Sequence, residues 1–124
     1  MKIVLAEDEP KVLEFLELFF RDAGHEVLTT SSGQGTLDLL RSAQPDVLLL
    51  DLWLTDNIDG MAILKQHKQL SPKTSAIVIS GTEEESAEAD VRKLGAVALL
   101  KKPIRLDELD ELVRRLRDRR PDGA

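Results

Sequence analysis

The chain of 124 residues contains no cysteine and only two histidines, His25 and His67. The lack of cysteine excludes disulfides, thiolate nucleophiles and cysteine-based zinc or iron–sulfur sites. Two histidines are too few for a histidine-based metal centre. Any metal ion that this protein binds must therefore be held by oxygen ligands.

No apolar run approaches the roughly 20 residues that a membrane span needs, and the N-terminus has no signal-peptide pattern. We therefore expect a soluble, cytosolic protein. The net charge of −6 argues against direct nucleic-acid binding. Five arginines lie between positions 114 and 120, where a helix dipole favours cations near its C-terminal end.

The length fits one domain, and 42% apolar residues are enough for one buried core. Short apolar runs alternate with stretches of helical period, which predicts an α/β fold with a parallel sheet. The predicted strands are 2–6, 26–30, 46–50, 75–80 and 97–101. The predicted helices are 10–23, 36–43, 61–70, 82–95 and 106–119. We expect one domain over residues 1–120 and a tail over 121–124.

Residues typical of helix ends and one continuous apolar run support these boundaries. Pro10 suits the first turn of a helix, Gly24 and Gly95 suit helix ends, and Thr82 can cap the fourth helix. In the predicted strand 46–50, the residues after Asp46 are apolar on both faces, as a central strand covered by helices on both sides requires.

Polar residues follow four of the predicted strands. They are Glu7-Asp8-Glu9, Asp51, Ser80-Gly81 and Lys102-Pro103. Each alone has an ordinary explanation as a helix cap, a turn, a strand end or a solvated side chain. In open α/β sheets, however, ligands bind outside the carboxyl ends of the strands. The convergence of these groups on one edge therefore predicts a binding site.

The acidic residues at this edge suit Mg²⁺, which prefers carboxylate, water and phosphate oxygens. Glu7, Asp8 and Asp51 can supply such oxygens, and a divalent cation would relieve their mutual repulsion. Asp51 could then attack a phosphoryl group and form an aspartyl phosphate, while Lys102 neutralises charge on the transferring oxygens. The Ser80 hydroxyl could bond the new phosphate.

These motifs, in this order and spacing, resemble a two-component response regulator receiver domain over nearly the whole chain. The resemblance also rests on Asp59-Gly60. It implies a doubly wound, flavodoxin-like (βα)5 fold with strand order 2-1-3-4-5. It further implies that Asp51 is the phosphoacceptor.

The resemblance assigns further roles around Asp51. The implied Mg²⁺ ligands are Asp8 directly, Glu7 through water, Asp51 and the backbone carbonyl of Trp53. On the phosphate side, the assigned residues are Ser80 as the switch hydroxyl, Gly81 as the small residue that leaves room, Thr82, Lys102 and Pro103. A cis peptide bond between Lys102 and Pro103 is also implied.

The sequence departs from the usual receiver pattern in two places. Thr55 stands where the family commonly has proline, and the step from Asp51 to Gly60 is one residue longer than usual. This loop resembles receivers of nitrogen-regulation activators, which carry an Asp-Ile-Trp-Leu stretch. Leu99 occupies the position where many receivers place Tyr or Phe, and the chain has no tyrosine. An aromatic switch reporter is therefore not expected.

Two alternatives remain open from the sequence. A haloacid-dehalogenase-type phosphatase also uses an Asp nucleophile with Mg²⁺, but it requires a second Asp where Trp53 stands, and its nucleophile follows the first strand. A pseudo-receiver would keep the fold as a binding module without phosphorylation, and the unusual loop from Trp53 to Ile58 is its best support.

The receiver resemblance implies a signalling domain rather than an enzyme, although one that assists its own phosphoryl transfer and dephosphorylation. It implies a histidine kinase or phosphotransfer protein as donor and an unidentified protein as target. Phosphorylation would change the surface formed by the fourth helix, fifth strand and fifth helix, and a phosphorylation-dependent homodimer is compatible with this.

Overall fold

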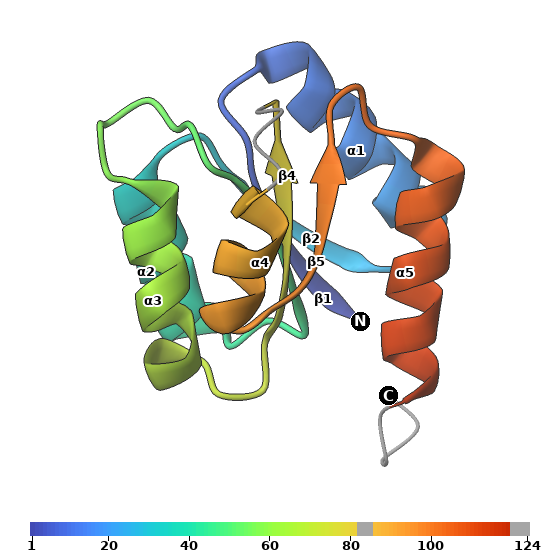
Figure 1. The fold of residues 1–124 in the computed structure, drawn as a ribbon. Helices are drawn as coiled ribbons and strands as arrows, with labels where there is room; N and C mark the ends of the chain where they lie inside the picture. Colours follow the sequence, from blue (N-terminus) through green and yellow to red (C-terminus); the bar gives the residue numbers. More distant parts are fainter. Residues whose placement is uncertain (82–85, 120–124) are drawn as a thin grey trace.

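A five-stranded parallel sheet lies between two layers of helices in the computed structural model, which describes residues 1–81 and 86–119 (Figure 1). The strands are β1 (Lys2–Ala6), β2 (Glu26–Thr30), β3 (Val47–Asp51), β4 (Ser75–Ser80) and β5 (Ala96–Lys101). The helices are α1 (Pro10–Asp22), α2 (Gly33–Ala43), α3 (Gly60–Leu70), α4 (Ser86–Lys93) and α5 (Leu106–Asp118). The strand order is β2-β1-β3-β4-β5, so the predicted fold class is confirmed.

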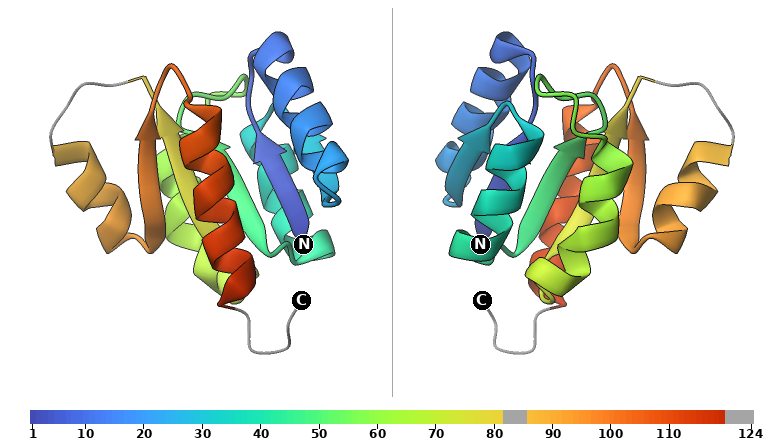
Figure 2. Two further views of the ribbon diagram at one scale, coloured as in Figure 1. Left: turned by 90° about the vertical axis from the view of Figure 1, so that its right-hand side faces the viewer. Right: turned by 90° about the vertical axis from the view of Figure 1, so that its left-hand side faces the viewer.

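Each face of the sheet has its own hydrophobic core. Helices α1 and α5 cover one face, and α2, α3 and α4 cover the other (Figure 2). Alternate residues of β3 serve the two cores: Val47 and Leu49 face α1 and α5, whereas Leu48 and Leu50 face the other layer. All four are buried. Burial on both sides explains why this strand reads as a continuous apolar run.

Most helix ends fall where the sequence predicts them. Pro10 occupies the first turn of α1, and Gly24 and Gly95, just beyond α1 and α4, have φ values of 94° and 101°. These left-handed conformations favour glycine because it has no Cβ. The predicted cap Thr82 and the tail 121–124 lie outside the described residues. Within the described part of the chain, no helix is long and apolar enough to span a membrane.

Helix α2 begins at Gly33, three residues earlier than predicted. Ser32 caps it by accepting a hydrogen bond from the Gly35 backbone N–H at 2.9 Å. Asp56 accepts from the Gly33 and Gln34 backbone N–H groups. These acceptors satisfy amides that have no partner within the helix, so α2 starts despite two glycines in its first turn.

The sheet reverses its winding direction at β1, which pairs with β2 on one side and with β3 on the other. The connections leaving β1 and β3 therefore run to opposite faces, and a crevice opens at their carboxyl ends. Glu7 follows β1, and Asp51 is the last residue of β3. The topology thus delivers both acids to the crevice.

Candidate functional site

Three carboxylates gather at the crevice. Glu7 is 4% exposed and Asp51 is 2% exposed, whereas Asp8 lies in solvent. One oxygen from each of the three lies within 4.8 Å of the others. The three acids that the sequence singles out as metal ligands are therefore brought together.

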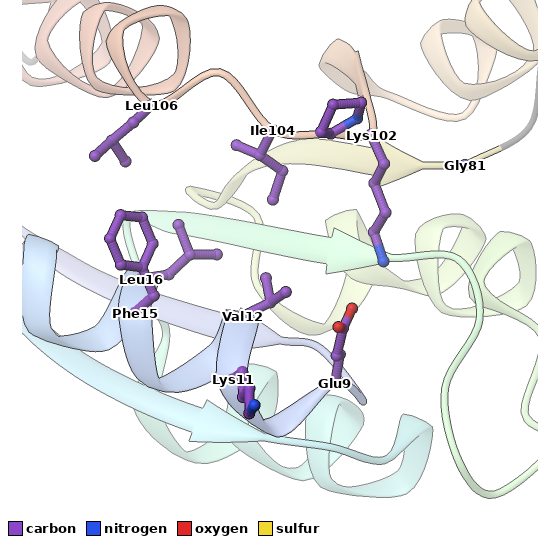
Figure 3. A pocket seen from close by; sticks show the side chains of 10 residues that line it. Glu9, Lys11, Val12, Phe15, Leu16, Gly81, Lys102, Ile104 and Leu106 are labelled. Atoms are coloured by element: carbon purple, nitrogen blue, oxygen red, sulfur yellow. The ribbon is translucent and has the colours of Figure 1, made fainter.

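Lys102 reaches these acids from the connection between β5 and α5. Its Nζ lies 2.9 Å from Asp51 Oδ2 and 3.2 Å from Glu7 Oε1. The Lys102 backbone N–H donates to the Ser80 carbonyl at 2.9 Å, which ties the end of β5 to β4. Figure 3 shows the extended Lys102 side chain, with its nitrogen at the end of β3. One lysine thus bridges two buried carboxylates.

The two buried carboxyls divide their charge unequally. Burial, together with a hydrogen bond to Asp51 and the negative charge of Asp51, raises the pKa of Glu7 to about 8. Burial alone would raise the pKa of Asp51, but hydrogen bonds from Glu7, the Trp53 N–H and Lys102 outweigh it and lower that pKa. Without a metal ion, Glu7 therefore carries a proton at neutral pH, and Asp51 is the ionised acid.

Lys102 stays charged in this setting. Burial would lower its pKa, but the hydrogen bond to Asp51 and the charges of Asp51 and Glu7 raise it instead. A permanently cationic group beside Asp51 can neutralise an anionic ligand or a transferring phosphoryl group.

The donor set fits Mg²⁺. Glu7 Oε2 is buried and has no hydrogen-bond partner among the described residues. An orphaned buried oxygen is costly, and three clustered acids against one lysine leave a net negative charge. A hard divalent cation with oxygen ligands relieves both costs. Glu7, Asp8 and Asp51 are the side chains that could hold it.

Trp53 lies beside this cluster through its backbone. Its N–H donates to Asp51 Oδ1 at 3.0 Å, so its peptide is fixed against the buried acid. Its indole is 72% exposed and does not pack into either core. A large apolar side chain thus stands in solvent two residues beyond Asp51.

The remaining predicted site residues that the structure describes lie at or just after the ends of β4 and β5. Ser80 is buried at the end of β4, the strand that pairs with β3, and Gly81 and Pro103 are exposed. The Lys102–Pro103 peptide bond is cis, as the resemblance implied. Thr82 falls outside the described residues.

A groove that the sequence analysis did not anticipate runs away from Lys102. Its volume is about 660 Å³, and it lies between α1 and the connection from β5 to α5. Figure 3 shows Val12, Phe15 and Leu16 on one wall and Ile104 and Leu106 on the other. Phe15 is 57% exposed and is not among the α1 residues that pack into the core.

Asp56 and Thr55 were also missed. Both bind the start of α2 from the connection between β3 and α3. Their signals in the sequence are the departures of this connection from the receiver pattern: its extra residue and Thr55 in place of proline.

Comparison with known proteins identifies the family. A family model described as "Response regulator receiver domain" matches residues 3–114. The regulator NtrC of Klebsiella pneumoniae is 34% identical over 111 residues, which cover 90% of this chain and 24% of NtrC. The sporulation initiation phosphotransferase F of Bacillus subtilis is 26% identical, with 92% of this chain and 91% of that protein covered.

Solved structures agree with this match. The receiver domain of the Francisella response regulator 1452 superposes with a TM-score of 0.87 at 26% identity, over 95% of this chain and 97% of that one. A putative response regulator from Chloroflexus aurantiacus gives a TM-score of 0.84 at 30% identity, over 95% and 98% of the two chains. The chain belongs to the response regulator receiver domains, the signalling domains of two-component systems.

Proposed function

We propose that Asp51 accepts a phosphoryl group from a histidine kinase or a phosphotransfer protein. The observation that carries this proposal is the pairing of a buried, ionised Asp51 with Lys102 at 2.9 Å, beside the orphaned oxygen of Glu7. A buried carboxylate kept ionised by a cation is a competent oxygen nucleophile. The dehalogenase alternative has no support, because Asp51 ends the third strand rather than following the first, and Trp53 occupies the place of the second Asp.

The transfer is a substitution at phosphorus. An oxygen of Asp51 attacks, a new P–O bond forms, and the P–N bond of the donor phosphohistidine breaks, leaving its electron pair on the imidazole nitrogen. Lys102 holds charge on the phosphoryl oxygens, since transfer of this kind is accelerated mainly by positioning and charge neutralisation. Hydrolysis of the acyl phosphate later returns Asp51, which completes the cycle.

We assign Asp8 as a direct Mg²⁺ ligand, Glu7 as a ligand through water, and Asp51 and the Trp53 carbonyl as further ligands. When bound, Mg²⁺ supplies positive charge to the transferring phosphoryl group. The raised pKa of Glu7 means that its proton must leave when the ion binds, so affinity increases with pH in the range below about 8.

The phosphate side of the site is assigned to Ser80, Gly81, Thr82, Lys102 and Pro103. The phosphate favours the arrangement of the connections after β4 and β5 in which Ser80 and Lys102 both contact it, so phosphorylation shifts a population. The changed surface is that of α4, β5 and α5. A hollow of about 320 Å³ lined by Arg92, Leu99, Leu112 and Arg115 already exists on this face.

We assign the groove beside Lys102 to the donor protein, because it begins at the lysine that bonds Asp51 and is lined by the exposed apolar Phe15. Phe15→Asp should therefore slow transfer from a protein donor and leave labelling by acetyl phosphate unchanged.

The output partner is a protein target, and a phosphorylation-dependent homodimer through the α4, β5 and α5 face is a second outcome. We do not assign these residues to direct contact with nucleic acid, because their net charge is −6. The chain spans about a quarter of the length of NtrC.

We take residues 1–120 as the receiver unit, followed by a tail of 121–124. We also propose a cytoplasmic location, which cell fractionation would test.

The decisive experiment for the function is acetyl-phosphate treatment in Mg²⁺ followed by intact-mass spectrometry. We expect an adduct of one phosphate that hydroxylamine removes, as an acyl phosphate requires. The pseudo-receiver alternative predicts no adduct.

A further inference from the structure

The connection 52–59 between β3 and α3 is held at its tip by the start of α2. Asp56 Oδ1 accepts from the Gly33 N–H at 2.7 Å, and Oδ2 accepts from the Gln34 N–H at 2.9 Å. Thr55 donates to the Ser31 carbonyl from its backbone N–H at 3.3 Å and from its hydroxyl at 2.9 Å. Although Asp56 is exposed, both of its oxygens are therefore in use.

The absence of a side chain at Gly33 makes this contact sterically possible. A Cβ at that position would lie 2.5 Å from Ile58 Cβ and 3.1 Å from Asp56 Oδ1. At its base, the connection is closed by Gly60, where a Cβ would lie 2.6 Å from Leu52 Cα. Leu54 is buried in the core between these points. The connection is thus fixed at its base, its middle and its tip.

The same end of α2 is bound to the other acidic connection. The Glu7 N–H donates to the Thr30 carbonyl at 3.1 Å, and the Thr30 hydroxyl oxygen accepts from the Ser32 N–H at 3.3 Å. Residues 30–34 therefore contact both the segment that carries Glu7 and the segment that carries Trp53 and Asp56. These are two of the segments to which we assign metal ligands.

We propose that Asp56 is a positioning residue of the metal site, whose carboxylate fixes the connection so that the Trp53 carbonyl is in place before Mg²⁺ binds. Trp53 lies three residues before Asp56, and its N–H is already bonded to Asp51. Ordering a free loop at the moment of binding costs affinity, and a loop ordered during folding does not carry that cost. The inference rests on the proposed function, because it presupposes that Mg²⁺ binds here.

Three variants separate positioning from charge and from helix stability. Asp56→Ala removes both hydrogen bonds and the charge. Gly33→Ala keeps the charge of Asp56 but forces Ile58 and Asp56 away, and alanine otherwise favours the helix. Ser32→Ala is the matched control, because it removes a different cap from the same helix and leaves the Asp56 contacts intact.

Mg²⁺ affinity is measured by titration calorimetry, together with amide exchange of the metal-free proteins and their melting temperatures. We expect Asp56→Ala and Gly33→Ala each to weaken Mg²⁺ binding about tenfold, the scale of a lost helix cap. Amide exchange should accelerate in residues 52–59 of both variants. Ser32→Ala should lower the melting temperature and leave the Mg²⁺ affinity unchanged.

Two results would overturn the inference: unchanged Mg²⁺ affinity in Asp56→Ala, or an equal loss of affinity in Ser32→Ala. Failure of the proposed function looks different. In that case the wild-type protein itself binds no Mg²⁺, although amide exchange in residues 52–59 still accelerates in Asp56→Ala, and both proposals fall together.

Discussion

Polar groups at the two ends of the sheet differ in how completely they are hydrogen-bonded. At the amino end, Asp46 accepts from the Lys2 N–H at 2.7 Å, and the hydroxyls of Ser71 and Thr74 bond each other, with Thr74 also donating to the Pro45 carbonyl. At the carboxyl end, three acids cluster, Lys102 bonds two of them, and Glu7 Oε2 has no partner among the described residues. Paired groups stabilise the fold, whereas an unpaired buried oxygen within a cluster of charged groups is typical of a binding site.

The amino end has one exception to this pattern. His67 is fully buried on α3, its Nδ1 donates to the Leu64 carbonyl, and its Nε2 has no partner within the described part of the chain. Unlike Glu7, it lies against the backbone of Gly95 rather than in a cluster of acids. A single orphaned atom is therefore weaker evidence of a site than an orphaned atom within a convergent charged group.

The largest expected effect contrasts Asp51 with Asp46. Asp51→Asn should abolish the phosphate adduct, because an amide cannot attack phosphorus and the variant also loses a metal ligand. Asp46→Ala should leave the adduct at wild-type yield but destabilise the fold by about 1 kcal/mol, because the half-buried Lys2 amide loses its acceptor. Intact-mass spectrometry and urea denaturation measure the two effects. A stable adduct on Asp51→Asn at full yield would refute the acceptor assignment.

The next effect concerns Glu7 and pH in metal-free protein. Its pKa rises from about 4.5 to about 8 on folding, so between these values the folded chain binds a proton that the unfolded chain has lost. Stability should therefore fall as pH rises through this window. Glu7→Gln should remove this slope and stabilise the metal-free protein at pH 8 by about 1–3 kcal/mol, because the amide needs no proton.

Urea denaturation in EDTA between pH 5 and 8 measures this slope. Exposed Glu9 provides the control, and Glu9→Gln should keep the wild-type dependence. Mg²⁺ should stabilise the wild-type protein at pH 8, since the three acids that we assign to it come together only in the folded chain. Parallel slopes in the wild type and Glu7→Gln would contradict the assignment of a buried, protonated Glu7.

Sequence alone predicted the convergent residues, because each strand end could be located from periodicity. Parallel strands place their carboxyl ends together, so Glu7, Asp8, Asp51 and Lys102 could be assigned to one edge before any geometry was known. The identity of Asp51 as the ionised acid could not be predicted. It depends on which carboxyl is nearer to Lys102 and on which accepts the Trp53 N–H.

The contacts of Asp56 were unpredictable for a different reason. Its partners are backbone amides 22 and 23 residues away, and backbone amides carry no sequence signal. The early start of α2 was missed in part for the same reason: besides its local cap Ser32, its first amides donate to Asp56 on another connection. Local rules locate elements, whereas contacts between loops depend on the assembled fold.

A smaller effect is expected from Trp53. Its indole is 72% exposed beside the acceptor, where it can border the path of a hydrolytic water but cannot orient one. Trp53→Asn should therefore raise the rate of dephosphorylation severalfold while phosphoryl uptake continues.

Decay of the phosphate is followed by mass spectrometry after acetyl phosphate is removed. Exposed Leu18→Asn on α1 is a matched apolar-to-polar control and should decay as the wild type does. An unchanged or slower decay in Trp53→Asn would leave Trp53 with only its backbone role.

The smallest effect concerns His67, the exception at the amino end. Its contribution to the pH dependence of stability disappears at neutral pH. Burial lowers the pKa of His67, and the charge of Lys68 adds to this, although the hydrogen bond to Leu64 opposes it. Because the unfolded chain then binds a proton that the folded chain does not, stability falls as pH drops below about 6.5, by up to about 1.4 kcal/mol per pH unit. His67→Met fills the space without a titrating nitrogen, so the stability of this variant should fall less between pH 6.5 and 5.5.

The pKa of His25 is also lowered, so His25→Gln measured in parallel separates the contributions of the two histidines. If His67→Met lost stability as steeply as the wild type, the buried Nε2 would have an acceptor in solution, and the contrast between the two ends of the sheet would no longer have an exception.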